Sequence, residues 1–492
     1  MRMNRTLETL PFDNTYARLP EVFYASVQPT PLTNPFLVSF NPDAAILLDL
    51  DPGEAKRPEF VEYFGGGRLL PGSEPVAMLY AGHQFGHYVP QLGDGRAVLL
   101  GEVRNGTGEK WDLHLKGAGI TPFSRDDDGR SVLRSTIREY LCSEAMYGLG
   151  IPTSRALCIV GSEEPVWREA VESGATLLRL APSHVRFGSF EVFYYRRQVD
   201  RVRQLADYVL EQHFPHLAAE ADRYASLLSE VATRTARLIA QWQAVGFAHG
   251  VMNSDNMSIL GLTLDYGPFG FLDDYDPSFI CNHSDGRGRY AFHHQPDIGY
   301  FNLRCLAQAL EPLVPEGPAR AALETYESTF AECYWGHMRR KVGFSESRSE
   351  DEALIRDLLT LLLADHVDYS NFFRALGEFR LRAEQEKAPL RDFFLDRAGW
   401  DAWAGRYRAR LEAEGSRDGE RKARMNRVNP KYVLRNYLAQ IAIERAAKER
   451  DFSEIERLRE LLRDPYAEQP EMERYAAPPP DWGKRIVVSC SS

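Results

Sequence analysis

Two kinds of hydrophobic pattern occupy separate parts of this chain, and their order limits the folds available to it. Between Pro75 and Ile120 short apolar or alternating runs indicate β-strands. After about Asp200 apolar residues recur at helical spacing, as they do from Tyr224 to Val245, where Gly246 ends the run. Strands first and helices later are typical of an α+β protein. The sequence therefore predicts a small β-rich part followed by a larger helical part.

The individual elements can be placed along the chain. The pattern predicts strands at Ala97–Val103, Trp111–Lys116, Thr176–Leu180 and Phe190–Tyr195. It predicts a helix over Ser131–Tyr147, because a turn at Asp126–Gly129 precedes this segment and Gly148 follows it. From about Asn302 to Arg463 almost every segment has the pattern of an amphipathic helix.

The composition excludes several classes of protein. The 492 residues carry 59 Lys and Arg against 70 Asp and Glu, a net charge of −11, which disfavours sequence-independent binding to nucleic acids. No run of ~18 apolar residues suggests a membrane span, and the N-terminus does not resemble a transit peptide. Six cysteines without a Cys-x-x-Cys pair argue against a disulfide framework or a structural zinc site. A cytoplasmic enzyme that binds neither nucleic acid nor membranes is the expectation.

Two features of the β-rich part could bind phosphate groups, although each has an ordinary alternative. Gly93 and Gly95 precede the strand that begins at Ala97, and such a turn can either approach a phosphate closely or simply join two strands. Lys116 lies on the polar face of its strand, and Glu139 lies on the helix that follows. A strand lysine held by a helix glutamate grips nucleotide phosphates in kinase-like folds, but both side chains could equally be solvated.

A third feature is more specific. The segment His249–Met257 ends in Asp255 and Asn256, and Leu264–Gly267 follows after a short apolar stretch. Asn followed by Asp-aromatic-Gly is the layout of a kinase-type metal site, where Asn256 and Asp265 would hold Mg²⁺. Kinases place an aspartate base two residues after the histidine, whereas Val251 stands there in this chain. Asp255 is the acid that could replace it, which indicates that the nucleotide is presented differently.

Arginines add to this set, since guanidinium groups suit bidentate contact with phosphate. Arg125, Arg130 and Arg134 lie around the Asp126–Gly129 turn, and Arg179 and Arg186 lie on either side of Ala181–His184. Any one of them could be a surface ion pair. Together they would suit the β- and γ-phosphates of an ATP bound in the inverted orientation.

The combined motifs resemble one known family, the selenoprotein O family of protein adenylyltransferases, which have a protein-kinase-like fold. The resemblance spans roughly residues 80 to 300, with shorter matches near the C-terminus. It is carried by the segments Ala81–Gly86, Gln91–Arg96, Leu115–Gly119, Thr121–Arg125, Asp128–Arg130, Leu133–Arg134, Ile137–Glu139, His249–Asn256, Leu264–Gly267, Phe279–Ser284, Asn429–Pro430, Val433–Asn436 and Cys490–Ser492.

The resemblance implies transfer of AMP from ATP to Ser, Thr or Tyr hydroxyls of proteins, with pyrophosphate released and self-modification possible. It implies that Asp255 accepts the proton and that Asn256 and Asp265 bind Mg²⁺ or Mn²⁺. The residues expected to hold the nucleotide are Gly93, Gly95, Arg96, Lys116 with its partner Glu139, Asp128, Gly129, Arg179, Arg186 and Asp265. Members of the family are thought to join two cysteines that correspond to Cys281 and Cys490, so a redox-regulated disulfide is expected.

The resemblance also implies a two-lobed architecture with appended segments. The expected parts are an extended N-terminal segment (1–75), a nucleotide-binding lobe (76–200), a catalytic helical lobe (201–330), a helical extension (331–464) and a tail (465–492). Three alternatives stay open: UTP with Mn²⁺ as the donor, a conventional kinase, and a scaffold without catalysis. Val251 disfavours the kinase, and the presence of Lys116 and Asp265 disfavours the scaffold.

Overall fold

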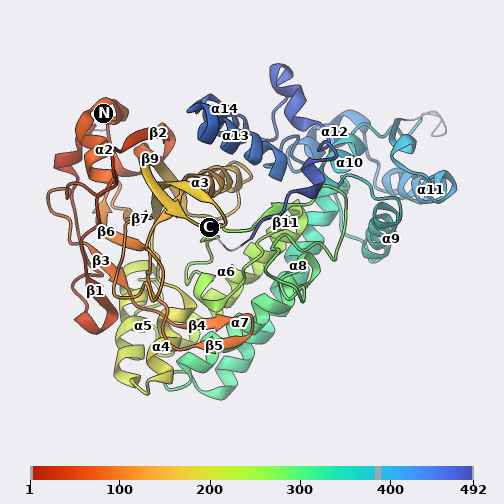
Figure 1. Ribbon diagram of the computed structural model, residues 1–492. Coiled ribbons are helices and arrows are strands. Elements are labelled where there is room, and N and C mark those ends of the chain that lie inside the picture. Colours follow the sequence, from red (N-terminus) through yellow and green to blue (C-terminus); the bar gives the residue numbers. More distant parts are fainter. Residues whose placement is uncertain (1–3, 383–388, 490–492) are drawn as a thin grey trace.

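The computed structural model describes residues 4–382 and 389–489. Within these residues the chain has a mixed α/β structure in which one large antiparallel sheet lies beside many helices (Figure 1). The described helices include none that is long and apolar enough to cross a lipid bilayer.

The large sheet has eight strands. Seven follow the order β1-β3-β6-β7-β10-β9-β2, β8 pairs with β10, and all of the pairs are antiparallel. Its strands are β1 (Tyr24–Ser26), β2 (Phe36–Phe40), β3 (Val76–Met78), β6 (Ala97–Arg104), β7 (Lys110–Lys116), β8 (Ser131–Val132), β9 (Arg155–Trp167) and β10 (Val171–Ala181). Two small hairpins lie outside it, formed by β4 (Gly82–Gln84) with β5 (His87–Val89) and by β11 (Phe247–Ala248) with β12 (Gly270–Phe271).

The strands predicted at β6, β7 and β10 are confirmed. Leu113 and Leu115 of β7 pack into a core that the N-terminal residues Leu48 and Phe60 complete. The opposite face of β7 is buried as well, because its polar side chains are held in ion pairs beneath the neighbouring elements. Strand β7 is therefore covered on both faces, except that Lys116 at its end borders a cavity.

The N-terminal residues do more than wrap this core. They supply strands β1 and β2 and the short helices α1 (Pro42–Ala45) and α2 (Pro58–Phe64). Pro stands at the first position of both helices, where its fixed φ favours the helical turn and its missing N–H leaves no bond unmade. Part of the sheet that carries the candidate site is thus built by this segment.

The strand predicted at Phe190–Tyr195 is wrong, because these residues form most of helix α4 (Phe187–Tyr195). Every side chain from Phe187 to Phe193 is buried, so the segment lacks the one-sided pattern of a surface helix. A short, continuous apolar run cannot be assigned to helix or strand by periodicity alone. The hydroxyl of Ser189, which accepts the Arg186 N–H at 3.2 Å, favours a helical start here.

The remaining helices agree with the predicted pattern. The helix predicted at Ser131–Tyr147 begins two residues later as α3, and the helix predicted to end at Gly246 ends there, with Gly246 at φ 78°. These helices are α3 (Leu133–Gly148), α5 (Val199–His213), α6 (Arg223–Val245), α7 (Gln295–Leu310), α8 (Glu316–Lys341), α9 (Asp351–Ala364), α10 (Tyr369–Leu376), α11 (Arg397–Ala413), α12 (Asp418–Asn426), α13 (Asn436–Glu449) and α14 (Ser453–Arg463).

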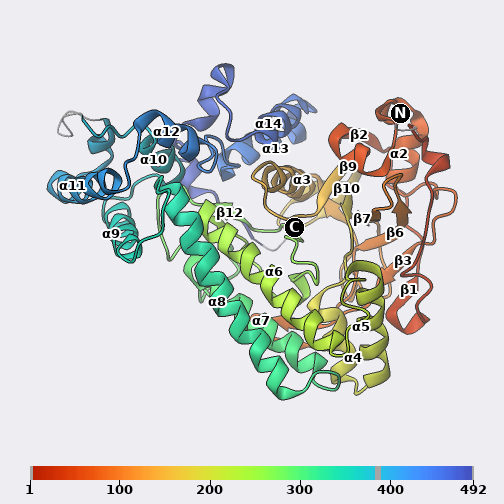
Figure 2. The ribbon, with the colours of Figure 1, turned by 180° about the vertical axis from the view of Figure 1, so that it is seen from behind.

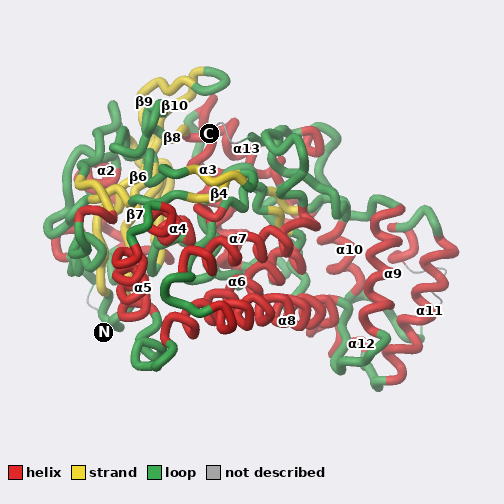
Figure 3. Tube along the Cα trace, turned by 90° about the horizontal axis from the view of Figure 1, so that it is seen from below, coloured by secondary structure: helices red, strands yellow, loops and turns green. Residues whose placement is uncertain are grey.

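The helices fall into two groups around separate cores. Helix α6 packs along α7 and α8, while α13 and α14 return to pack on α3 (Figure 2). Helices α9 to α12 lie at the far end of α8 (Figure 3), around a second core that contains Trp400, Trp403 and Tyr407. Residues 465–489 also pack on the protein, since Tyr475 is buried in the first core and Ile486 packs against that core.

Candidate functional site

A cavity of about 400 Å³ lies where the sheet faces the loops that follow α6. Nine of the expected site residues line it: Gly93, Gly95, Arg96, Lys116, Arg179, Arg186, Asp255, Asn256 and Asp265. The first and last of the segments that carry them are more than 160 residues apart in the sequence, and the fold brings them together around one cavity.

The turn before β6 is shaped by its glycines and by one buried acid. Gly93 has φ 95°, and a Cβ there would lie 2.7 Å from the ring of Phe123, so only glycine fits. Between the glycines the side chain of Asp94 points inward and accepts the Met78 N–H at 3.0 Å and a hydrogen bond from His114 Nε2 at 3.0 Å. Asp94 therefore ties the turn to strands β3 and β7 of the sheet.

Lys116 and Glu139 form the expected pair. Lys116 Nζ, at the end of β7, donates to Glu139 Oε2 on α3 at 2.6 Å, and the glutamate is buried. Burial lowers the pKa of Lys116 and the charge of Glu139 opposes that change. The pair leaves the ammonium group at the cavity wall.

Two arginines bind the carboxylate of Asp265. Arg179 of β10 and Arg186, just before α4, each donate to one of its oxygens. Arg179 also donates to Glu139 Oε1 at 3.2 Å, so this set forms a continuous charge cluster with Lys116. Burial would raise the pKa of Asp265, but Arg186 and Arg179 hold it well below its ordinary value. We call Lys116, Glu139, Arg179, Arg186 and Asp265 the cavity cluster.

The backbone of Asp265 is unusual, with φ 54° at a residue other than glycine. This left-handed conformation costs about 1 kcal/mol for an ordinary residue and persists only where the surroundings enforce it. The two arginines supply that constraint, and the conformation turns the carboxylate toward the cavity.

Asp255 is a buried acid of the site whose pKa is raised rather than lowered. Its side chain is 6% exposed, Gln84 Nε2 donates to Oδ2 at 3.1 Å, and Oδ1 has no hydrogen-bond partner among the described residues. Burial raises its pKa from 3.8 to about 7, while the Gln84 bond and the charge of Arg186 oppose that rise. A carboxyl with this pKa changes protonation near neutrality, as a general base requires.

The β4–β5 hairpin, which carries Gln84, packs directly on Asp255. A Cβ at Gly82 would lie 2.6 Å from Asp255 Oδ1, so glycine is required for this close approach. His83 N–H donates to Ser254 Oγ at 2.7 Å and adds a second tie between the hairpin and the loop.

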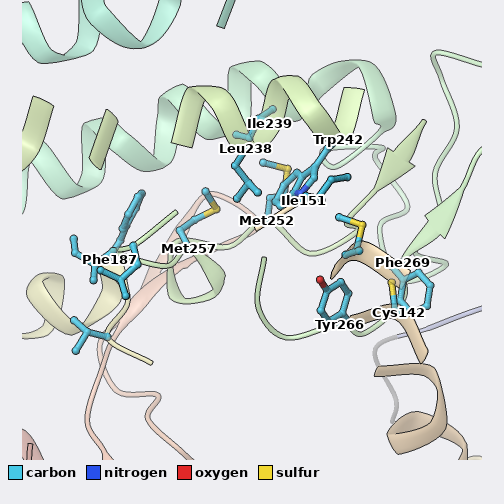
Figure 4. Close-up of a cluster of buried hydrophobic side chains, with 14 of the residues drawn as sticks. Cys142, Ile151, Phe187, Leu238, Ile239, Trp242, Met252, Met257, Tyr266 and Phe269 are labelled. Atoms are coloured by element: carbon cyan, nitrogen blue, oxygen red, sulfur yellow. The ribbon is translucent and has the colours of Figure 1, made fainter. Parts of the chain in front are cut away.

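The loop that carries Asp255 and Asn256 rests on a rigid apolar layer. Met252 and Met257, before and after the polar residues, are buried among side chains of α6 that include Leu238 and Trp242 (Figure 4). Asn256 Nδ2 donates to the Val251 carbonyl at 3.0 Å, which holds the amide in place. The alternation of apolar anchors and polar residues along the loop fixes the direction in which the polar side chains point.

Besides Glu139, which lies behind Lys116, two expected nucleotide-binding residues do not line the cavity. Asp128 accepts two hydrogen bonds from Arg168, at 2.7 and 2.9 Å, and Gly129 packs against the Gly119 backbone. Of the three arginines around this turn, only Arg125 lines the cavity. Arg130 forms an ion pair with Glu164, and Arg134 forms one with Glu172. Both guanidinium groups therefore contact carboxylates and do not face the cavity. In the described arrangement this turn contributes Arg125 and Asp127 to the cavity instead.

Three polar residues of the site escaped the sequence reasoning: Asp94, His114 and Gln84. Arg179 Nη2 donates to His114 Nδ1 at 2.7 Å, so the His114 ring links the glycine turn to the arginine. A signal was present for His114, because it shares the polar face of β7 with Lys116. Asp94 stands inside the glycine turn and Gln84 inside the Ala81–Gly86 motif, but neither pattern specified a role.

The donor groups at the loops suit a hard divalent cation. The Asp265 carboxylate and the Asn256 side chain supply oxygen donors to the cavity wall, and Mg²⁺ and Mn²⁺ prefer such oxygen ligands. The Asn256 amide nitrogen is engaged with Val251, which leaves its oxygen available for a cation. These residues therefore fit the expected metal.

Comparison with known proteins identifies the family. The sequence model of the family described as protein adenylyltransferase SelO matches residues 6–463. A protein nucleotidyltransferase YdiU from Myxococcus xanthus (strain DK1622) is 64% identical over 487 residues, which cover 99% of this chain and 100% of the relative. Proteins of the same description from Thiobacillus denitrificans (strain ATCC 25259 / T1) and Thioalkalivibrio sulfidiphilus (strain HL-EbGR7) are 60% and 59% identical, each over 99% of this chain and 100% and 99% of the relative.

These matches extend over nearly the whole chain and include every segment that builds the cavity. The sequence resemblance is thereby confirmed. The chain belongs to the SelO family and is an enzyme of the protein nucleotidyltransferase class.

Proposed function

We propose that this enzyme transfers AMP from ATP to Ser, Thr or Tyr hydroxyl groups of proteins, itself included. The observation that carries the proposal is the pairing of Val251 with Asp255. Val251 occupies the position of the kinase base and cannot accept a proton, while Asp255 lines the same cavity with a free carboxylate oxygen and a pKa raised by burial to about 7. A base at a different position from that of kinases suits attack at the α-phosphorus instead of the γ-phosphorus.

In this proposal the sheet and the helical part form the two lobes of a kinase-like fold, with ATP inverted between them. The triphosphate end would lie against Arg96, Lys116, Arg179 and Arg186. Within the cavity cluster three cations, Lys116, Arg179 and Arg186, meet two carboxylates, Glu139 and Asp265, which leaves one positive charge for phosphate oxygens. Asp128 and Gly129 would contribute only if their turn moved, because Arg168 and the Gly119 backbone now engage them.

The reaction would be a single displacement at the α-phosphorus. The acceptor hydroxyl oxygen forms a bond to that phosphorus, and the bond from phosphorus to the oxygen that bridges to the β-phosphate breaks. Pyrophosphate leaves with the electron pair, and the hydroxyl proton passes to Asp255. Arg179 and Arg186 would stabilise the charge that develops on the leaving phosphates.

Asn256 and Asp265 would hold the divalent cation. When bound, Mg²⁺ or Mn²⁺ neutralises phosphate charge and orients the phosphates for in-line displacement. Asp265 now engages both arginines, so cation binding would draw the carboxylate away and free the guanidinium groups for phosphate. The same carboxylate would thus offset part of the arginine charge until the nucleotide binds.

The decisive experiment compares ATP labelled at the α- and the γ-phosphate. Purified protein, with a protein acceptor, should retain label from α-³²P-ATP and none from γ-³²P-ATP, and Asp265→Asn should retain neither. Retention of γ-label would indicate a kinase, and retention of no label from any nucleotide would indicate a scaffold. Parallel assays with α-³²P-UTP and Mn²⁺ identify the preferred donor.

We also propose that a Cys281–Cys490 disulfide regulates the enzyme in the cytoplasm. Cys490 lies outside the described residues, but His283 N–H donates to the Val488 carbonyl at 2.8 Å. The two chain segments therefore run side by side two residues away from each cysteine. Exchange with an oxidised dithiol or glutathione disulfide would join the two sulfurs. The S–S bond of the oxidant breaks, and its two sulfurs leave as thiols that carry the two electrons and the two protons. The tail would then be tethered beside Gly250, whose Cβ position lies 2.6 Å from Cys281 Sγ.

Peptide mapping of unreduced, alkylated protein tests the bond, and assays with and without reductant test the regulation. The expected result is one cross-linked peptide pair and higher activity after reduction. Full alkylation of both cysteines after mild oxidation would refute the bond.

A further inference from the structure

Three side chains of different chemical type meet outside the nucleotide cavity. His83 of β4, Glu191 of α4 and Cys305 of α7 offer one donor atom each, and these atoms all lie within 4.8 Å of one another. His83 Nδ1 lies 2.5 Å from Glu191 Oε2, so a hydrogen is shared between them. We call these residues the His–Glu–Cys cluster.

The buried carboxylate of this cluster is only half satisfied. Glu191 is 0% exposed, and its second oxygen, Oε1, has no hydrogen-bond partner among the described residues. A buried carboxylate normally has partners for both oxygens, since removing the group from water is costly. The free oxygen is therefore available to a ligand at the cluster.

Cys305 is suited to supply the third contact. It is 7% exposed, and its Sγ lies within 4.8 Å of the donor atoms of His83 and Glu191. A divalent cation would bind it as a thiolate, because a coordinating thiol loses its proton.

We propose that the His–Glu–Cys cluster binds one Zn²⁺ ion through His83 Nδ1, the Glu191 carboxylate and Cys305 Sγ. Imidazole, carboxylate and thiolate are all common zinc ligands. The two charges of the ion would be balanced by one thiolate and one carboxylate, which suits a buried position. The sequence contained no hint of this site, because the three ligands lie on three separate elements and no Cys-x-x-Cys pair is involved.

The fourth coordination position would face a second cavity. This cavity of about 420 Å³ is lined by His83, Gly86, Phe301, Arg304, Cys305 and Gln308. A water molecule from it would complete a tetrahedral site. Apart from the proposed ligands, Arg304 is the only charged side chain among the residues that line this cavity. Its positive charge would not repel the bound ion strongly, because the thiolate and the carboxylate balance the charge of the ion.

Binding would replace a hydrogen by the metal. The ion takes the place of the hydrogen between His83 Nδ1 and Glu191 Oε2, and these atoms separate from 2.5 Å to roughly 3.3 Å, the edge of a tetrahedron with ~2.0 Å bonds. The displaced hydrogen exchanges to Nε2 of the same imidazole, so His83 stays neutral, and the Cys305 proton passes to solvent. No atom is oxidised or reduced in this step.

The site would act on the hairpin that contacts the catalytic loop. His83 N–H donates to Ser254 Oγ, and the adjacent Gln84 donates to Asp255 Oδ2 at 3.1 Å. An ion that joins β4 to α4 and α7 would fix the hairpin in the position that holds Asp255. This clamp is independent of the Mg²⁺ or Mn²⁺ expected at Asn256 and Asp265.

Titration of the metal-free full-length protein with Co²⁺ tests the proposal, because a thiolate ligand to Co²⁺ produces a near-ultraviolet charge-transfer band. The band should saturate at one equivalent in the wild type. Cys305→Ser should lack it, and His83→Gln should bind Co²⁺ at least about tenfold more weakly. Cys333→Ser, a cysteine on α8 outside the cluster, should keep the band. Circular dichroism verifies that each variant is folded.

Asp265→Asn separates this site from the nucleotide cavity. The cavity offers a cation oxygen donors, so its metal gives no thiolate band, and Asp265→Asn should keep the band even though transfer activity is lost. Zn²⁺ should displace Co²⁺ and appear as one bound ion in native mass spectrometry. A wild type without the band at saturating Co²⁺, or a folded Cys305→Ser variant with an undiminished band, would overturn the proposal.

Discussion

The two ends of strand β7 each carry a lysine on the same face, and their surroundings differ sharply. Lys110 Nζ donates to Glu102 Oε1 at 2.5 Å, to Thr15 Oγ1 at 2.7 Å and to Tyr208 OH at 3.2 Å. Lys116 Nζ, six residues on, donates to Glu139 and otherwise faces the cavity. Both lysines form ion pairs with a buried glutamate, yet only one of them has a surface left for a ligand.

The difference lies in what covers each pair. The N-terminal segment and α5 bring Thr15 and Tyr208 over Lys110 and satisfy its donors, which makes a closed, structural cluster. Nothing comparable covers Lys116 among the described residues, and the cavity cluster keeps more cations than carboxylates. An ion pair therefore indicates function only where the fold leaves its charge facing an open cavity.

The largest effect is expected at Asp265, the carboxylate that joins the two arginines. Asp265→Asn should lower nucleotidyl transfer by on the order of 10³-fold or more, because the cation and the phosphates lose their shared anchor. Steady-state label transfer measures this loss, with Asp392→Asn, a 77% exposed side chain, as the matched control. If the Asn variant kept wild-type activity, the cavity cluster would be as structural as the Lys110 cluster.

Asp255 should give the next largest effect and a distinct pH profile. Because its folded pKa lies at about 7, kcat/KM should rise with pH up to that value and then level off. Asp255→Asn should lower turnover by on the order of 10²-fold and abolish the rising limb, since no carboxylate remains to be ionised. Equal profiles for both proteins would assign the base elsewhere.

Stability provides a second measurement on Asp255. The folded state binds its proton more tightly than the unfolded state, whose pKa is near 3.8, so wild-type stability should fall as pH rises from about 4 through 7. The loss is on the order of 2–4 kcal/mol above pH 7. Asp255→Asn lacks this loss, so the variant should become relatively more stable than the wild type as the pH rises.

Paired substitutions of the two lysines test the comparison directly. Lys116→Met should lower transfer about 10- to 100-fold with little change in melting temperature, because Glu139 keeps Arg179 as a partner. Lys110→Met should leave kcat unchanged but destabilise the fold by ~3–5 kcal/mol, since Glu102 stays buried without its cation. Thermal unfolding and label transfer on both variants distinguish these outcomes, and the reverse assignment would contradict the comparison.

The smallest effect is expected at Gly82, where the hairpin meets Asp255. Gly82→Ala places a Cβ 2.6 Å from Asp255 Oδ1, so the carboxylate must shift by a few tenths of an ångström or more. Turnover should fall roughly tenfold while ATP binding changes little, because only the base is displaced. Gly86→Ala is a poor control, since Gly86 has φ 84°; Gly317→Ala, with open space around it, is the better one.

Local sequence patterns were sufficient wherever one chain segment carried the information. The two periodicities predicted the strands β6, β7 and β10 and the helix α6, and the loops predicted Asn256 and Asp265 at one cavity. They failed at α4, because an apolar run that is buried on all sides has no periodic signature. The family resemblance implied that Asp128 holds the nucleotide, and in the structure its carboxylate pairs with Arg168, which lies between β9 and β10.

The sequence by itself determined the order of strands and helices, the family and the chemical types of the site residues, because spacing and residue type are local properties. Only the tertiary structure decided which charged side chains face a cavity and which are covered by other segments. Lys110 and Lys116 lie on the same face of the same strand, and each pairs with a buried glutamate. They differ because distant segments of the chain cover Lys110 and leave Lys116 at the cavity. The same holds for His83, Glu191 and Cys305, whose meeting depends on three elements packing together. Burial sets the pKa of a group and the hydrogen bonds open to it, and burial is a property of the whole fold.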